Sequence, residues 1–147
     1  MISVETRNHV RTHLLADEGL RLRPYTDTVG KLTIGVGRNL SDVGISAVEA
    51  YDLLEHDIDR AVLALSARYI WFGTLDPVRQ AVLVNLCFNL GIGGLRKFVN
   101  TLAAVERGDY AAAARGLQAS LWYRQVQRSR SSRLIQMMLS GTWPEPT

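Results

Sequence analysis

The sequence has very little cysteine: Cys87 stands alone among 147 residues, and it lies in the apolar run 81–90. A single cysteine excludes an intrachain disulfide and is typical of a reducing compartment. The apolar neighbours predict a buried thiol that packs in a core.

Other absences narrow the class of protein. Tracts rich in acidic residues, glutamine, or serine and glycine are missing, which excludes extensive disorder. The first twenty residues contain no continuous apolar segment of the kind that a secretory signal needs. No apolar run elsewhere approaches the length that spans a bilayer, so we expect a protein that is soluble as made, without stable membrane insertion.

Acidic residues are also absent between Asp109 and Glu145. That stretch holds five arginines, Arg115, Arg124, Arg128, Arg130 and Arg133. The whole chain has a net charge of only +3, so these five arginines make this stretch far more basic than the chain as a whole. Such a stretch predicts a surface that attracts a polyanion. Nucleic acid, lipid headgroups and the carboxylate-rich peptides of the bacterial cell wall are all anionic partners that such a surface could bind.

Apolar spacing and capping residues predict helices and a small hairpin. Hydrophobic residues make up 47 % of the chain, which is enough for one substantial core. The hairpin is expected from extended segments at 21–25 and 31–37. The expected helices are 4–18, 47–66, 77–90, 98–107, 110–119 and 129–140.

This order of elements predicts a mainly helical α+β fold, with the small sheet set between the first helix and the long second one. We expect a single domain over 1–147, with a small lobe at about 15–60 and a helical lobe at about 61–147 that includes the N-terminal helix. A cleft between the lobes would follow. In the second strand, alternation should turn Leu32, Ile34 and Val36 toward a core and Thr33 toward the open face.

Two carboxyl groups lie in unlike settings near the start of the chain. Glu18 ends the first helix, where the negative pole of the helix dipole disfavours an ionised carboxylate, whereas Asp27 begins a polar turn. Glycoside hydrolysis requires one protonated and one ionised carboxyl group. Thr33 adds a hydroxyl that can hold a water molecule near Asp27. Taken singly, such residues are also common on protein surfaces.

The spacing of these residues is specific. The segment runs Glu18, eight residues, Asp27, five residues, Thr33, and then Ile-Gly-Val-Gly over 34–37. In this it resembles the phage-type lysozymes, the glycoside hydrolase family typified by the T-even phage enzyme. The resemblance covers nearly the whole chain, because it continues through Asp-Pro-Val-Arg at 76–79, Phe-Asn-Leu-Gly at 88–91, Trp-Tyr at 122–123 and Gly-Thr-Trp at 141–143.

The resemblance implies a lysozyme-like fold and a muramidase that hydrolyses the β-1,4 bond between N-acetylmuramic acid and N-acetylglucosamine in peptidoglycan. It implies that Glu18 is the general acid, that Asp27 and Thr33 direct a water molecule, and that the anomeric carbon is inverted. No metal or organic cofactor is expected. His9 and His13 have the spacing of a zinc pair, but no third ligand is evident in the sequence.

Further positions follow from the same resemblance. Phe88, Asn39 and Thr101 would line the sugar cleft, although a phenylalanine at helical spacing is more often part of a core.

Three charged residues are expected to support the site. Arg38 occupies the place that the T-even enzyme gives to histidine, and we expect it to pair with Asp57 in the long helix. Arg130 is expected to reach toward Glu18 and position it, with Arg128 as a rival because of an apparent one-residue insertion.

By resemblance, the chain is expected to be a monomeric endolysin that acts in host-cell lysis. It would accumulate in the host cytoplasm and reach the periplasm and cell wall after a holin opens the inner membrane. Two other activities stay open. The basic C-terminal stretch also fits a small helical nucleic-acid-binding protein, although the hairpin then has no role. A lytic transglycosylase would cut the same bond with one acid, but Asp27 and Thr33 favour hydrolysis because both can handle water.

Overall fold

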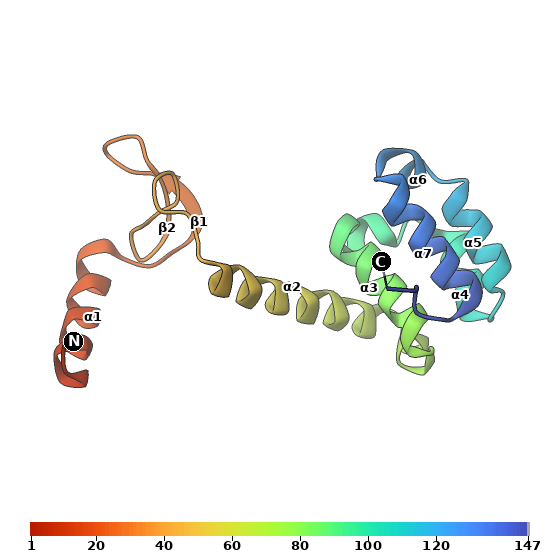
Figure 1. The fold of residues 1–147 in the computed structure, drawn as a ribbon, viewed down its shortest axis with the longest axis horizontal. Coiled ribbons are helices and arrows are strands. Elements are labelled where there is room, and N and C mark those ends of the chain that lie inside the picture. Colours follow the sequence, from red (N-terminus) through yellow and green to blue (C-terminus); the bar gives the residue numbers. More distant parts are fainter. Residues whose placement is uncertain (147) are drawn as a thin grey trace. The chain divides into compact units, whose positions relative to one another are not determined.

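The protein is described here by a computed structural model, and the structure describes residues 1–146. The chain forms two compact units, Met1–Asp52 and the part from Leu53 onward, and the boundary falls inside helix α2 (Ala47–Arg68). The described residues form seven α-helices, one short 3-10 helix and a three-stranded antiparallel sheet, labelled in Figure 1 where there is room. The predicted α+β class, mainly α, is confirmed.

In the first unit, helix α1 (Val4–Glu18) has the bounds that the sequence predicts. It begins where the Ser3 hydroxyl accepts a hydrogen bond from the backbone N–H of Thr6 at 3.0 Å. It ends before Gly19, whose φ of +71° is a conformation that residues with a side chain rarely adopt. Glu18 is therefore fixed in the last turn of the helix, directly before the sheet.

The sheet has three short strands in the order β1-β2-β3, namely β1 (Arg21–Thr26), β2 (Leu32–Gly35) and β3 (Arg38–Asn39). Thr33 on the middle strand pairs with Tyr25 on one side and Asn39 on the other. The predicted hairpin is confirmed, and the register places Thr33 between two neighbouring strands.

The predicted facing of the second strand is wrong. Thr33 is buried, with 3 % of its surface exposed, whereas Leu32 and Val36 are 45 % and 39 % exposed. Thr33 is covered because strands flank it on both sides, while Leu32 and Val36 lie at or beyond the ends of β2. The strand is thus too short for simple alternation to decide which residues are buried.

Helix α2 begins with the capping box that the sequence predicts. The Ser46 hydroxyl accepts from the backbone N–H of Glu49 at 3.2 Å, and the Glu49 carboxylate accepts from the backbone N–H of Ser46 at 2.7 Å. Beyond the boundary with the second unit, Ala61 and Leu65 of α2 are buried.

In the second unit, helix α3 (Pro77–Leu95) starts as predicted, with Asp76 accepting from the backbone N–H of Arg79 at 3.0 Å. Gly91 has φ +72° and ψ +162°, which interrupts the helix next to its predicted end. A further helical turn then runs to Leu95. Sequence propensity misses this turn because it contains two glycines, but Leu95 is only 1 % exposed and its burial outweighs the propensity.

Three more predicted helices are confirmed to within one residue, namely α4 (Val99–Glu106), α5 (Tyr110–Gln118) and α7 (Arg128–Ser140). The 3-10 helix η1 (Ile70–Thr74) and helix α6 (Leu121–Gln125) are not predicted. Both are too short to be stable through local propensity alone. Each contains one buried aromatic side chain, Phe72 or Trp122, which ties it to the core.

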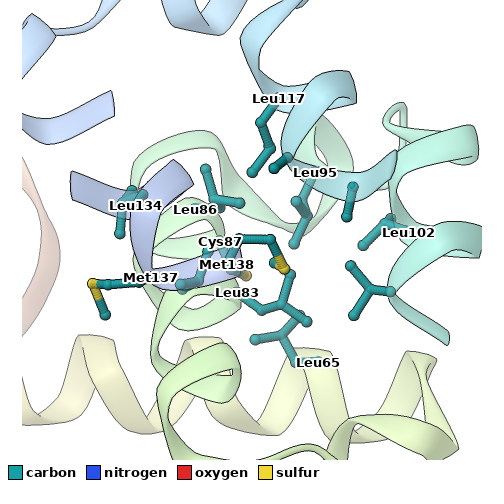
Figure 2. Packing of buried hydrophobic residues seen from close by; sticks show 14 of the residues in the cluster. Leu65, Leu83, Leu86, Cys87, Leu95, Leu102, Leu117, Leu134, Met137 and Met138 are labelled. Atoms are coloured by element: carbon teal, nitrogen blue, oxygen red, sulfur yellow. The ribbon is translucent and has the colours of Figure 1, made fainter. Parts of the chain in front are cut away.

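The core of the second unit is one cluster drawn from several helices. Figure 2 shows members from α2, α3, α4, α5 and α7, among them Leu65, Leu83, Leu102, Leu117 and Met138. Cys87 belongs to the same cluster and is 5 % exposed, which confirms the predicted buried thiol. Burial raises the pKa of this thiol.

Helix α3 is long and apolar enough to cross a membrane by length and composition alone. The expectation that no segment approaches that length is therefore wrong for 77–95. In this structure the apolar residues Val82, Leu83 and Leu86 of α3 are instead buried in the core of the second unit.

Arg79 of α3 ties that helix to the end of α7. Its guanidinium donates to the carbonyls of Met138 at 2.8 Å and Leu139 at 2.9 Å, and it lies over the ring of Tyr110 with its central carbon 3.5 Å from the ring centre. It also pairs with Asp76 at 3.1 Å. One cation thereby satisfies helix-terminal carbonyls that have no partner within α7.

We predict that Arg79→Met lowers the free energy of unfolding by about 2–3 kcal/mol, because it leaves partly buried carbonyls without a donor. Urea unfolding followed by circular dichroism measures the change. Arg68→Met, at the exposed end of α2, is the control and should change the free energy by less than about 0.5 kcal/mol. Equal losses in the two variants would contradict this role for Arg79.

Candidate active site

The Glu18 side chain extends from the end of α1 to the turn between β2 and β3. A Cβ atom placed on Gly37 in that turn would lie 2.8 Å from Glu18 Cδ and 2.9 Å from Glu18 Oε2. The Glu18 carboxyl therefore occupies the space beside a residue without a side chain. None of the ion pairs in residues 1–146 includes Glu18.

Asp27 begins the turn that joins β1 to β2. Its Oδ1 accepts hydrogen bonds from the backbone N–H groups of Val29 at 3.0 Å and Lys31 at 2.8 Å. Such a pair of bonds fixes the carboxylate to its own turn. Within residues 1–146, Oδ2 of Asp27 accepts no hydrogen bond, so it is available to another donor.

The backbone of Lys31 connects Asp27 with Thr33. Its N–H donates to the Asp27 carboxylate, and its carbonyl accepts from the backbone N–H of Asp27 at 2.9 Å. The same carbonyl accepts from the Thr33 hydroxyl at 3.0 Å. Because the Thr33 hydroxyl uses its hydrogen in this bond, its oxygen is left to accept from a further donor.

Asn39 is engaged in its own turn. Its side-chain nitrogen donates to Asp42 at 3.0 Å, and its side-chain oxygen accepts from the backbone N–H of Asp42 at 3.0 Å. The other carboxylate oxygen of Asp42 pairs with the Lys31 ammonium at 3.1 Å. Asn39 lies beside Thr33 in the sheet and keeps one amide hydrogen for another partner.

The expected pairing of Arg38 with Asp57 is wrong. Arg38 instead donates to both carboxylate oxygens of Glu49, at 2.7 and 2.9 Å, and to the Gly44 carbonyl at 3.1 Å. Asp57 forms an ion pair with Arg60, one turn along α2. Glu49 is the nearer acid because it sits in the first turn of α2, while Asp57 lies about two turns further along.

In the second unit, Phe88 of α3 is 48 % exposed and lines a cavity of about 630 Å³. The walls of the cavity are mainly apolar, and their polar residues are Gln80, Asn85 and Arg130. Phe88 is therefore available for contact with a ligand, as its expected role requires, and its use in sugar binding stays a prediction.

Thr101 does not have the position expected of a sugar ligand. It is 8 % exposed, and a Cβ placed on Gly116 of α5 would lie 2.3 Å from its hydroxyl oxygen. Thr101 thus packs where α4 meets α5, and the absence of a side chain at Gly116 makes room for it. This placement supports a packing role and does not support contact with substrate.

The structure separates the two rival arginines. Arg130 donates to the side-chain oxygen of Asn85 through two of its nitrogens, at 2.7 and 2.9 Å. Arg128 instead stacks on the Tyr123 ring and bonds to its hydroxyl. Arg130 is thereby the member of the pair that lines the cavity, while its approach to Glu18 stays a prediction.

Sequence reasoning missed three contributions to these surroundings. Gly37 was not connected with Glu18, although both belong to the same conspicuous motif. Asn85 gave no signal, because a polar residue in an apolar helix is recognised as a partner only when Arg130 is placed beside it. Asn89 accepts from the Trp122 indole at 3.0 Å, a contact between residues far apart in the sequence.

The mainly helical α+β fold, with a small N-terminal hairpin that follows a helix-terminal glutamate, is consistent with a lysozyme-like fold. Comparison with known proteins makes the assignment narrower. The phage lysozyme family matches residues 16–136, which is most of the chain. The chain therefore belongs to the phage lysozyme family, and it is a glycoside hydrolase of the lysozyme type.

Individual relatives support the assignment to this family. A probable T4-type lysozyme of Dictyostelium discoideum is 29 % identical, over 88 % of this chain and 92 % of that protein. The pre-baseplate central spike protein of Enterobacteria phage T4 is 31 % identical, over 87 % of this chain but only 27 % of that protein. The SAR-endolysin of Escherichia phage Mu is 31 % identical, over 70 % of this chain and 60 % of that protein. The chain thus spans about a quarter of the T4 spike protein and nearly all of the Dictyostelium lysozyme.

The Arg38–Glu49 pair generates a prediction about pH. Hydrogen bonds from Arg38, and then from the Ser46 backbone, lower the pKa of Glu49 from its ordinary 4.5 to about 2. A depressed carboxyl pKa stabilises the folded state fully above the unfolded value, and this stabilisation is lost as pH falls through the folded value. Glu49→Gln should therefore melt below wild type at pH 7, and the difference should shrink between pH 4.5 and about 2.

Arg38→Met is the matched variant for this experiment, because the ion pair needs both partners. Its melting temperature should also lie below that of wild type at pH 7, and the difference should shrink over the same pH window. A difference between Glu49→Gln and wild type that stays constant from pH 7 to pH 2 would show that the pair does not produce the pH dependence.

Proposed function

We propose that this protein hydrolyses the β-1,4 bond between N-acetylmuramic acid and N-acetylglucosamine in bacterial peptidoglycan, with Glu18 as the general acid. The observation that supports this most directly is the hydrogen-bonded turn that joins Asp27 to Thr33 through the Lys31 peptide. The next turn of the same small sheet holds Gly37 against the Glu18 carboxyl. Membership of the phage lysozyme family supplies the class of reaction.

In this mechanism Glu18 donates a proton to the glycosidic oxygen as the leaving sugar departs. Asp27 and Thr33 hold the attacking water, and the Asp27 carboxylate takes up the proton that this water loses as its oxygen bonds to the anomeric carbon. The unoccupied Oδ2 of Asp27 and the hydroxyl oxygen of Thr33 are both acceptors, so each can take one hydrogen of the same water. The lone pair of that water is then directed at the anomeric carbon.

A water molecule placed in this way attacks from the face opposite the leaving group, so we propose inversion. Inverting enzymes keep their two carboxyl groups about 6.5–9.5 Å apart to make room for the water, whereas retaining enzymes hold them about 5 Å apart. Proton NMR of the first anomer released distinguishes inversion from retention.

For the sugar contacts we propose Phe88, through its exposed ring, and Asn39, through its remaining amide hydrogen. Arg130 is proposed to position Glu18. We also propose that residues 1–147 act as one catalytic domain and as a monomer, without a metal or organic cofactor.

The biological role that fits is that of an endolysin, which acts on the cell wall after release. We propose that release depends on a holin, with the protein held in the host cytoplasm until then. The name of the Mu relative supports the endolysin role. A lytic transglycosylase remains the alternative on the same substrate, and product mass separates the two, since only hydrolysis adds one water.

The decisive variant is Glu18→Gln, which removes the acid at almost constant shape. We expect clearing of purified peptidoglycan to slow by about 10²- to 10⁴-fold, the usual contribution of a general acid. Circular dichroism checks that the variant is folded. Asp17→Asn, the neighbouring exposed acid on α1, is the control and should clear peptidoglycan like wild type.

Loss of clearing in both variants would point to a general effect of charge at the end of α1. An inactive wild type, or full activity in Glu18→Gln, would contradict the glycosidase proposal. The basic helical nucleic-acid-binding protein would then become the leading interpretation of the C-terminal arginines.

Those arginines also support a proposal about wall attachment. Arg124, Arg128 and Arg133 are exposed in the stretch without acidic residues. We expect Glu18→Gln to sediment with peptidoglycan sacculi at about 0.01 M salt and to be released near 1 M, since the screening length falls from about 30 to 3 Å. Binding that does not change with salt would contradict an electrostatic attachment.

A further inference from the structure

We infer that Gly37 is a positioning residue for Glu18, because its missing side chain provides the space in which the Glu18 carboxyl is held. The inference rests on the proposed function, in which Glu18 is the general acid. In the sequence, Gly37 is noted only as part of a strand motif, and the inference assigns it a role of its own.

The contact involves the reactive end of the side chain. A Cβ atom on Gly37 would lie 2.8 Å from Cδ, 2.9 Å from Oε2 and 3.0 Å from Cγ of Glu18. Atoms in van der Waals contact stand about 3.5–4.0 Å apart, so the smallest side chain already overlaps the carboxyl group. One of the two groups would have to move.

The turn that carries Gly37 is the less mobile of the two. The next residue, Arg38, is anchored by its bonds to both oxygens of Glu49 and to the Gly44 carbonyl. Glu18, in contrast, is exposed and ends in three rotatable bonds. A side chain at position 37 would therefore displace the Glu18 carboxyl and leave the turn in place.

Such a displacement costs little stability but affects catalysis strongly. A general acid must lie within hydrogen-bond reach of the atom it protonates, at about 2.6–3.2 Å. Moving a catalytic group by about 1 Å can lower the rate by about 10²-fold. The structure therefore predicts a variant that is folded and slow.

Gly35 provides a matched control. It lies two residues before Gly37 and has φ +72°, close to the +66° of Gly37, so alanine meets similar backbone strain at both positions. A Cβ on Gly35, however, would have no neighbour within 4 Å. Comparing the two alanine variants separates displacement of Glu18 from the effect of the backbone conformation.

The experiment compares Gly37→Ala with Gly35→Ala in the full chain. We expect both variants to fold, with a melting temperature that falls slightly further in Gly37→Ala because of the contact with Glu18, together with a decrease in kcat of about 10²-fold only in Gly37→Ala. KM should change little, and the alkaline limb of the pH–rate profile should move only in Gly37→Ala, because that limb reports the acid. Equal kcat losses in the two variants, or full kcat in folded Gly37→Ala, would overturn the inference.

A second measurement tests the contact without using activity. Glu18→Ala removes Cδ, Oε2 and Cγ, so Gly37→Ala should lower the melting temperature less in that background than in wild type, whereas Gly35→Ala should act equally in both. If Gly37→Ala alone does not fold, folding of the Glu18→Ala/Gly37→Ala pair supports the inference, and its failure overturns it. Coupling between positions 18 and 37, together with full activity of Glu18→Gln, would keep the contact and remove the proposed function.

Discussion

The candidate site depends on one peptide group. The N–H of Lys31 donates to the Asp27 carboxylate, and its carbonyl accepts from both the Asp27 backbone and the Thr33 hydroxyl. These bonds set the turn between β1 and β2 and leave one acceptor of Asp27 and one of Thr33 without a partner in the described chain. The roles proposed for Asp27 and Thr33 both use these two remaining acceptors.

The acid side of the site is built on the opposite principle, which is the absence of an atom. Glu18 has its place because α1 ends at Gly19 and because Gly37 offers no Cβ. Arg38 then fixes the turn through Glu49, at the start of the next helix. The four residues 18, 37, 38 and 49 thus form one connected arrangement, in which a helix end, a turn and a helix start are held together.

Much of this could be predicted from the sequence, because local rules decide it. Ser3 and Gly19 bound α1, the Ser46–Glu49 capping box starts α2, and Asp76 with Pro77 starts α3. The segment that contains Glu18, Asp27 and Thr33, together with the similarity that continues along the chain, indicates the family that the comparison shows. What failed was long-range: the burial of Thr33, the packing of Thr101 and the partner of Arg38 all depend on which segments meet in space. The short helices η1 and α6 were missed for the same reason, since each is held by a single buried aromatic side chain.

The end of α7 is closed by a residue from elsewhere in the second unit. Arg79 takes the carbonyls of Met138 and Leu139, and Gly141 caps the helix with φ +65°. The last helix is thus completed by residues up to 141, and residues 142–146 that follow are exposed. A module finished in this way can be joined at its C-terminal side to another polypeptide without being rebuilt.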